Sequence, residues 1–281
     1  MGSTGSIQNP TEQGMSKQLT VVKIGGKVID DEASLDAFLN DFAQLTGPKI
    51  LVHGGGKIAS AIGQKLGIEP FYHEGRRITD LETLDLVTMV YGGLVNKRIV
   101  AKLQALNENA LGLTGADGNI LPAQKRPVQE IDYGYAGDIY ADEVNVYSIV
   151  KLLDAGFTPV LSALTHDQMG HMLNTNADTI ASVVAGGLSM RTNYQVSKLV
   201  YCFEQPGVLE DFATKKVIDH IDLVKYQSLK SQGIINEGMI PKMHNAFDAL
   251  KGGALEVKIG HFSDITNLVS GDNTGTKITL E

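Results

Sequence analysis

The stretch Ile50–Lys57, ILVHGGGK, joins an apolar run to a histidine, three consecutive glycines and a lysine. Ordering glycine costs more conformational entropy than ordering any other residue, so three in succession need a reason. The segment is not a mononucleotide-binding loop of the G-x-x-x-x-G-K-[ST] type, because Leu51 occupies the first glycine position and Ile58 follows the lysine. The looser dinucleotide pattern, ending here in Ala59, follows the second predicted strand rather than the first. Any phosphate bound here is therefore expected to be held by a loop of a different type from these two.

Strands and helices alternate around this stretch. Leu19–Ile24 and Lys49–His53 are short apolar runs, each closed by glycines, and both are predicted to be buried strands. Apolar residues at helical spacing follow each run, over 35–45 and 58–66. This order predicts an α/β fold with a mainly parallel central sheet. Carboxyl ends of parallel strands share one edge of a sheet, so the two glycine clusters are expected to face one crevice.

The rest of the chain continues this pattern. Thr79–Glu82 has the capping-box form and is expected to open a long helix toward Leu106. Residues 129–144 alternate around two glycines, which predicts a β-hairpin or a small antiparallel annex. Further strands are expected at 111–113, 158–161, 198–203 and 256–259, and a helix at 241–250. Two tightly joined lobes would meet near residue 180.

Composition narrows the class of protein. The 281 residues are 43% hydrophobic and 20% charged, as in a globular protein with a sizeable core, and the net charge of -8 argues against a general nucleic-acid surface. The single cysteine, Cys202, suits a reducing compartment such as the cytoplasm. No apolar run approaches about 18 residues, so no membrane span is expected. Met1–Gly14 is polar without a signal-peptide core; residues 1–18 are expected to be a disordered tail, with Met15 the natural start.

Two lysines occupy positions that favour a nearby anion. Lys23 lies inside an otherwise apolar strand, where an unpaired buried ammonium is strongly destabilising. Lys242 follows Pro241 in the first turn of a predicted helix, where the macrodipole disfavours a cation by about 0.3 to 1 kcal/mol. A phosphate at that helix end would explain the second position. An edge-strand lysine and a solvated surface lysine are the ordinary alternatives.

Two polar motifs are further candidates. In NTNAD, Asn174–Asp178, three polar side chains exceed what one helix cap requires, so Asp178 is a candidate for orienting lysines or holding a metal, and Asn174 for donating to a substrate. EGRRIT, Glu74–Thr79, places two arginines in a loop, and the guanidinium fork suits carboxylate or phosphate. A simple cap and solvated arginines are the alternatives. No metal-ligand spacing and no serine or cysteine nucleophile motif is found.

Five motifs in order resemble those of the N-acetylglutamate kinases of the amino acid kinase family, from Leu19 to the C-terminus. They are KIGG (23–26), HGGG (53–56), EGRRIT (74–79), MLNTNAD (172–178) and GIINEGMIPK (233–242). The resemblance implies a three-layer α-β-α sandwich, with an acyl-amino-acid-binding lobe at 19–180 and a nucleotide-binding lobe at 181–281. It implies phosphorylation of the side-chain carboxylate of N-acetyl-L-glutamate by ATP with Mg²⁺, in arginine biosynthesis.

The resemblance also assigns roles to residues. Lys23 and Lys242 correspond to two catalytic lysines and Asp178 to the residue that organises them, with no metal ligand expected. Backbone groups that bind phosphate are expected at Gly25, Gly26 and Gly54, and substrate-binding groups at Gly55, Gly56, Arg77 and Asn174. One departure is CFEQPGVL (202–209), where the family usually has L-T-D-V-P-G-V-L: Glu204 and Gln205 alter the border of the nucleotide pocket.

This reaction would explain the glycines. A carboxylate with an ordinary pKa near 4.3 is already ionised at neutral pH and needs no general base, so the obstacle is bringing two anions together. Lysines and glycine N–H groups offset the repulsion between the carboxylate and the phosphates. The alternatives are a kinase for N-succinyl-glutamate, a carbamate or glutamate kinase, and a sensor without catalysis. The resemblance further implies a homodimer formed through the helix after Thr79. In the resembling family, arginine-inhibited members carry an extra amino-terminal helix that links dimers into a hexamer. Residues 2–17 carry no amphipathic stripe, so the resemblance implies a dimer that is insensitive to arginine.

Overall fold

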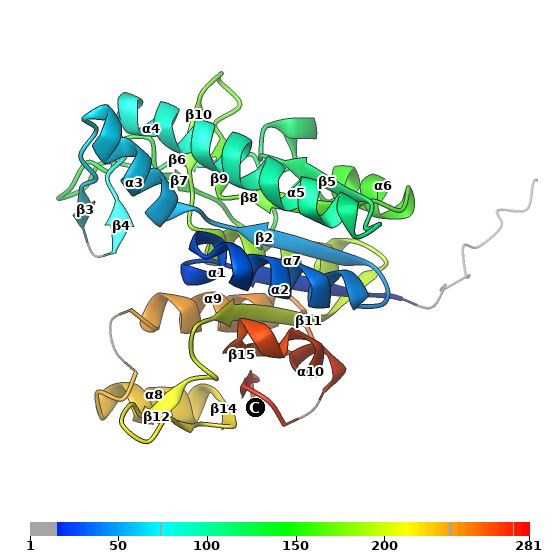
Figure 1. Cartoon of the computed structure of the whole chain (residues 1–281). Helices are drawn as coiled ribbons and strands as arrows, with labels where there is room; N and C mark the ends of the chain where they lie inside the picture. The colour runs from blue at the N-terminus through cyan, green and yellow to red at the C-terminus, as the bar shows by residue number, and fades with distance from the viewer. Residues whose placement is uncertain (1–15, 74, 236–237, 272) are drawn as a thin grey trace, which may run out of the picture.

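A computed structural model describes residues 16–73, 75–235, 238–271 and 273–281 (Figure 1). The tail predicted at the amino terminus falls outside the described residues up to Met15. Three residues of the motifs, Glu74, Asn236 and Glu237, also lie outside them.

One eight-stranded sheet runs through the molecule in the order β14-β16-β15-β11-β1-β2-β8-β5. Its strands are β1 (Lys17–Ile24), β2 (Lys49–His53), β5 (Ala110–Leu113), β8 (Thr158–Ser162), β11 (Tyr194–Phe203), β14 (His220–Ile221), β15 (Val257–His261) and β16 (Thr276–Ile278). Neighbours pair in parallel except β15 with β16. The predicted mainly parallel sheet is therefore confirmed.

Helices cover both faces of the sheet, which makes the predicted three-layer sandwich (Figure 1). One face carries α2, α5 and α10, and the other carries α6, α7 and α9. The α-helices are α1 (Lys27–Asp30), α2 (Glu32–Gln44), α3 (Gly56–Leu66), α4 (Leu81–Val87), α5 (Asn96–Ala105), α6 (Val146–Asp154), α7 (Ala177–Arg191), α8 (Leu223–Ser231), α9 (Ile240–Lys251) and α10 (Ile265–Ser270). Three short or irregular helices are η1 (Thr88–Val95, a π-helix), η2 (Asp117–Asn119) and η3 (Phe262–Asp264).

Small two-stranded pairs decorate the sandwich. They are β3 (Tyr72–His73) with β4 (Arg76–Arg77), β6 (Gln124–Lys125) with β7 (Gly137–Asp138), β9 (Leu164–His166) with β10 (Met172–Asn174), and β12 (Leu209–Asp211) with β13 (Lys216–Val217). The annex predicted over 129–144 is antiparallel, as expected, but it is not a hairpin within that range. Its first strand begins upstream at Gln124, and the residues between the two strands form a loop.

The hydrophobic pattern explains the elements that frame the glycine turns. All five residues of β2 are buried, because helices cover both faces of a central parallel strand. In α2, the apolar stripe packs into the core while Asp31 caps the helix by accepting a hydrogen bond from Ser34 N at 2.8 Å. The apolar pattern and helix cap within residues 20–66 therefore account for where β1 and β2 end.

The long helix after Thr79 begins one residue later than the capping-box pattern suggests. Asp80 is the cap, since its carboxylate accepts from Thr83 N at 2.8 Å. The hydroxyl of Thr79 instead donates to the carbonyl of Arg77 and accepts from Asn174 Nδ2 at 3.0 Å. The predicted cap is therefore wrong by one residue, and the threonine lies beside the candidate site.

Candidate active site

Two glycine turns lie side by side at one edge of the sheet. Gly25 and Gly26 follow β1, Gly54–Gly56 follow β2, and these parallel strands are paired up to Ile24 and His53. Both turns border one cavity of about 260 Å³. The single crevice expected from the sequence is therefore present.

Glycine is required in both turns, by backbone conformation in the first and by close packing in the second. Gly26 has a φ of 52°, in the left-handed region, and a Cβ there would lie 2.8 Å from Glu204 Oε1. A Cβ on Gly55 would lie 2.8 Å from the ring of Tyr91, which packs over the second turn. Each turn therefore brings bare backbone to the cavity wall, where an anion can approach the N–H groups.

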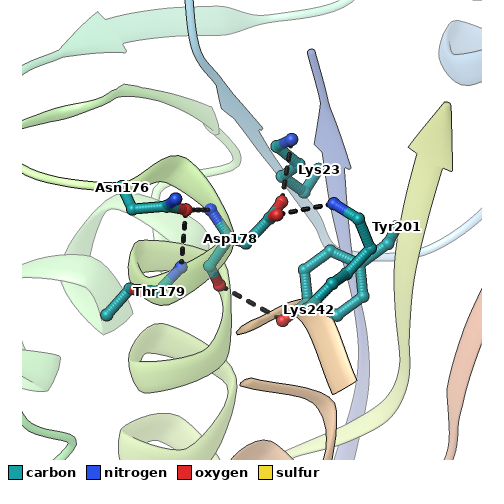
Figure 2. Close-up of polar contacts among 6 residues, drawn as sticks. All are labelled: Lys23, Asn176, Asp178, Thr179, Tyr201 and Lys242. Carbon is teal, nitrogen blue, oxygen red and sulfur yellow. Dashed lines mark hydrogen bonds and ion pairs between the residues drawn. The ribbon is translucent and has the colours of Figure 1, made fainter. Parts of the chain in front are cut away.

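A buried cluster of opposite charges forms one wall of the site (Figure 2). Lys23 Nζ lies 2.8 Å from Oδ1 of Asp178, and Lys242 Nζ lies 2.6 Å from Oδ2. The three side chains are 12–16% exposed. Lys23 comes from β1, Asp178 from the first turn of α7, and Lys242 from the first turn of α9. The fold thus brings together residues 219 positions apart in the chain (242 − 23).

Electrostatics keep the central carboxylate ionised. Burial alone would raise the pKa of Asp178, but the charges of Lys23 and Lys242 outweigh it and hold that pKa well below its ordinary value. One carboxylate between two ammonium groups leaves this wall with a positive charge. The wall is therefore suited to an anion that enters the cavity.

Helix caps and a tyrosine fix the position of Asp178. The side chain of Asn176 accepts hydrogen bonds from the backbone N–H of Asp178 at 2.7 Å and of Thr179 at 3.4 Å. Tyr201 donates its hydroxyl to the carbonyl of Asp178 at 3.2 Å (Figure 2). Because a helix N-terminus favours a negative group, both the cap and the macrodipole stabilise the carboxylate here.

Arg77 joins the wall of the cavity to the second glycine turn. Its Nη2 donates to the carbonyl of Gly56 at 3.0 Å and to Ser60 Oγ at 2.8 Å, and also to the hydroxyl of Tyr72. The side chain is buried, and it borders the cavity. Asn174 lies on the same wall and donates Nδ2 to Thr79. Arg77 therefore supports the turn as well as facing the cavity.

The cavity contains most of the predicted site residues. Its walls include Lys23, Gly25, Gly26, Gly54, Gly55, Gly56, Arg77, Asn174 and Asp178. Lys242 is brought to the site through its ion pair with Asp178. The roles assigned to these residues stay predictions.

Sequence reasoning missed several wall residues. They are Tyr72, Tyr91, Arg126, Gly137, Thr175 and Asn176. Asn176 belongs to the NTNAD run, and its capping pattern is the signal that would have found it. Tyr91 occupies an ordinary buried position of a helix, and Arg126 pairs with Asp138 as a fork, with Nε lying 3.0 Å from Oδ2. No local pattern distinguishes such residues.

The described residues hold no group of three His, Cys, Asp or Glu side chains arranged to bind a metal ion. None of their helices has the length and apolarity needed to cross a bilayer. Cys202 is buried, and burial raises the pKa of its thiol, so it is not an activated nucleophile.

Comparison with known proteins places this geometry in a family. The model of the amino acid kinase family matches residues 18–261. Acetylglutamate kinase of Bacteroides thetaiotaomicron is 51% identical over 265 residues, covering 94% of this chain and 99% of that protein.

Solved structures share the fold. The N-acetylglutamate synthase of Neisseria gonorrhoeae superposes with a TM-score of 0.78 at 24% identity, over 95% of this chain and 60% of that chain. The carbamate kinase of Giardia superposes with a TM-score of 0.65 at 13% identity, over 95% of this chain and 100% of that chain. Because the family model spans most of the sequence and a relative is about half identical over nearly its whole length, this chain belongs to the amino acid kinase family.

Proposed function

We propose that this chain transfers the γ-phosphoryl group of ATP to the side-chain carboxylate of N-acetyl-L-glutamate, forming an acyl phosphate in arginine biosynthesis. The observation that carries the proposal is the buried Lys23–Asp178–Lys242 cluster beside two bare glycine turns. The substrate follows from the acetylglutamate kinases that are about half identical to this chain.

The proposed acceptor, a carboxylate, needs no general base to remove a proton before it attacks. Its carboxylate is ionised at neutral pH, so the site must overcome repulsion between two anions and stabilise the charge of the transition state. Lys23 and Lys242 provide fixed positive charge, and Asp178 holds both ammonium groups in place before the substrates arrive. Preorganised cations of this kind are worth more in a buried site than in water.

The glycine turns supply the second part of the mechanism. Gly26, Gly55 and Gly56 border the cavity, and in this proposal their N–H groups donate to the phosphoryl oxygens. Arg77 binds the α-carboxylate of the acyl-glutamate and Asn174 donates to the same substrate. ATP enters as its Mg²⁺ complex. Mg²⁺ bound to the phosphates would neutralise part of their charge.

The two halves of the sheet divide the substrates. Residues 19–180, with β1, β2, β5 and β8, bind the acyl-amino acid. Residues 181–281, with β11, β14, β15 and β16, bind the nucleotide. Residue 180 falls inside α7, so the boundary is a shared helix rather than a linker. Glu204, the residue after β11, accepts a hydrogen bond from Lys27 N at 3.1 Å and borders the first glycine turn from the side of the proposed nucleotide half.

A second candidate substrate is N-succinyl-L-glutamate. Besides Arg77, two further arginines border the cavity, Arg76 and Arg126. A succinyl group adds a carboxylate that a cationic wall favours. The panel that decides between them offers glutamate, N-acetyl-glutamate and N-succinyl-glutamate with ATP and Mg²⁺, and traps the acyl phosphate with hydroxylamine.

We expect hydroxamate from N-acetyl-glutamate and none from free glutamate. Greater turnover of N-succinyl-glutamate would transfer the assignment to that substrate. Absence of ATP turnover with every acceptor of this panel, and with carbamate tested beside it, would favour a non-catalytic sensor. The proposed enzyme is a homodimer of the cytoplasm, insensitive to arginine.

A further inference from the structure

A buried histidine lies directly beneath the second glycine turn and has no part in the proposed chemistry. His53 is the last residue of β2, immediately before Gly54, and its side chain is fully buried. A buried imidazole needs partners for both ring nitrogens, because an unpaired polar atom in a core is costly. Its partners reveal its orientation and its protonation.

Asn96 fixes one side of the ring. Its Oδ1 accepts from Lys97 Nζ at 3.1 Å, and its Nδ2 donates to the carbonyl of Val160 at 2.9 Å. Lysine can only donate and a carbonyl can only accept, so the orientation of the amide is determined. Nδ2 lies 3.0 Å from Nε2 of His53, which must therefore accept.

The other nitrogen carries the proton. Nδ1 of His53 lies 2.8 Å from the carbonyl oxygen of Gly54, which can only accept a hydrogen bond. The imidazole is therefore neutral, with hydrogen on Nδ1 and a lone pair on Nε2. Burial lowers the pKa of His53 to about 4, which agrees with a ring that stays neutral at physiological pH.

All three carbonyl groups of the turn are held. The carbonyl of Gly54 accepts from His53, that of Gly55 from Ala59 N at 2.9 Å, and that of Gly56 from Arg77. In a trans peptide unit the C=O and the next N–H point in opposite directions. Holding the carbonyl of Gly54 thus fixes the direction of the N–H of Gly55. Neither the N–H of Gly55 nor that of Gly56 donates to any group of the described residues.

We infer that His53 is a positioning residue: its Nδ1–H holds the Gly54 carbonyl and so aims the N–H of Gly55 at the transferring phosphoryl group. This inference rests on the proposed function. It assigns a specific task to the histidine of HGGG, which acts through backbone and touches no substrate.

Two amide substitutions separate this task from general packing. In His53→Asn the amide nitrogen occupies roughly the place of Nδ1 and keeps a donor for Gly54. In His53→Gln the amide is one methylene further out, near Nε2, and the donor is lost. We expect kcat near wild type for His53→Asn and about 10- to 100-fold lower for His53→Gln. KM for ATP and for the acyl-glutamate should stay nearly constant in both.

A control variant at another buried position shows how much a loss of stability alone changes kcat. Thr158→Val removes a buried hydroxyl at the amino end of β8, on the opposite edge of the sheet from the cavity. It should lower the thermal midpoint without lowering kcat. If His53→Asn and His53→Gln give the same kcat after matching for stability, the inference is overturned.

Nitrogen NMR of the imidazole tests the geometry without any substrate. A protonated Nδ1 and unprotonated Nε2 at neutral pH are expected in the wild-type protein. An Nε2–H tautomer would overturn the inference even if the kinase assay succeeds. The reverse result, the expected tautomer with no turnover in the substrate panel, would remove the proposed function instead.

Discussion

Lys23 and Lys242 approach the same carboxylate but have different surroundings. Lys23 comes from the centre of the sheet, whereas Lys242 comes from a helix end and lies 5.7 Å from the centre of the Tyr201 ring. Asp178 binds one lysine through each oxygen, so neither lysine replaces the other. Removing either one would leave a buried carboxylate with a single partner and the site with less positive charge.

Lys23→Ala and Lys242→Ala should therefore each lower kcat by about 10²- to 10³-fold, with much smaller changes in KM for the acyl-glutamate. Lys251→Ala is the matched control, because it removes an exposed lysine from the same helix, α9. Steady-state kinetics with both substrates give the answer. A near-normal kcat in either variant would remove that lysine from the mechanism.

Arg77→Lys should chiefly raise KM for the acyl-glutamate. A lysine point charge cannot reproduce the planar fork, and it cannot hold Gly56, Ser60 and Tyr72 together as one guanidinium nitrogen does. The two KM values are measured in the same assay. If KM for ATP rises while that for the acyl-glutamate is unchanged, Arg77 does not bind the acceptor.

His53 makes the stability of the fold depend on pH. Burial chiefly, with the charge of Lys97, lowers its pKa from 6.5 to about 4, so the unfolded chain binds a proton first as the pH falls. The stabilisation is complete above pH 6.5 and is lost progressively down to about pH 4, by about 3 kcal/mol in all. Urea unfolding across this range should show a smaller loss in His53→Asn. Equal slopes in the two proteins would contradict it.

At the scale of the elements, the sequence predicted β1, α2, β2 and α3 well because each has one dominant pattern. Short apolar runs closed by glycine end where the structure ends them, as in β2, whose bounds match. The π-helix η1 was not predictable, because Gly92 and Gly93 interrupt the apolar run at 88–95 without specifying the wider hydrogen-bond pattern of a π-helix. Its Tyr91 packs over the second glycine turn, at Gly55.

The residues of the candidate site also divide into those that the sequence predicts and those that it does not. Lys23 and Lys242 were predictable because each breaks a local rule, as a cation in an apolar strand and a cation in the first turn of a helix. Asp178 was predictable because NTNAD carries more polar side chains than one helix cap requires. Tyr91 and Tyr72 break no rule, so only the folded chain places them at the cavity. A residue that lines the cavity only through packing contacts has no distinguishing pattern at its own position in the sequence.

Gly55→Ala should test the contact between η1 and the turn. The added methyl would meet the Tyr91 ring at 2.8 Å, which should destabilise the fold by about 1 to 3 kcal/mol. Tyr91→Ala in the same chain should remove most of that extra cost, giving a favourable coupling energy in a double-mutant cycle. Gly93→Ala is the control within η1, since a Cβ there meets nothing within 4 Å. Additive free energies of unfolding would show that the two elements do not clash.

At the scale of the whole molecule, one sheet joins the two proposed lobes without a linker. β1 pairs with β2 on one side and with β11 on the other, so the proposed acyl and nucleotide halves meet in the middle of the sheet. Sequence reasoning predicted the tight junction from the absence of a linker. The position of the division depends on which substrate each half binds, and that is a property of the assembled site.

The helix formed by α4, η1 and α5 leaves three large apolar side chains exposed, Leu81 (57%), Met89 (59%) and Leu94 (41%). Exposed apolar groups gathered on one element favour association, and a second copy of this chain would bury them. Met89→Arg should therefore convert a dimer into a monomer in light scattering, whereas Met169→Arg, at an exposed loop residue, should not. An arginine titration of the wild-type enzyme should leave both its mass and its activity unchanged. A hexamer whose activity falls with arginine, or a Met89→Arg protein that stays dimeric, would place the interface elsewhere.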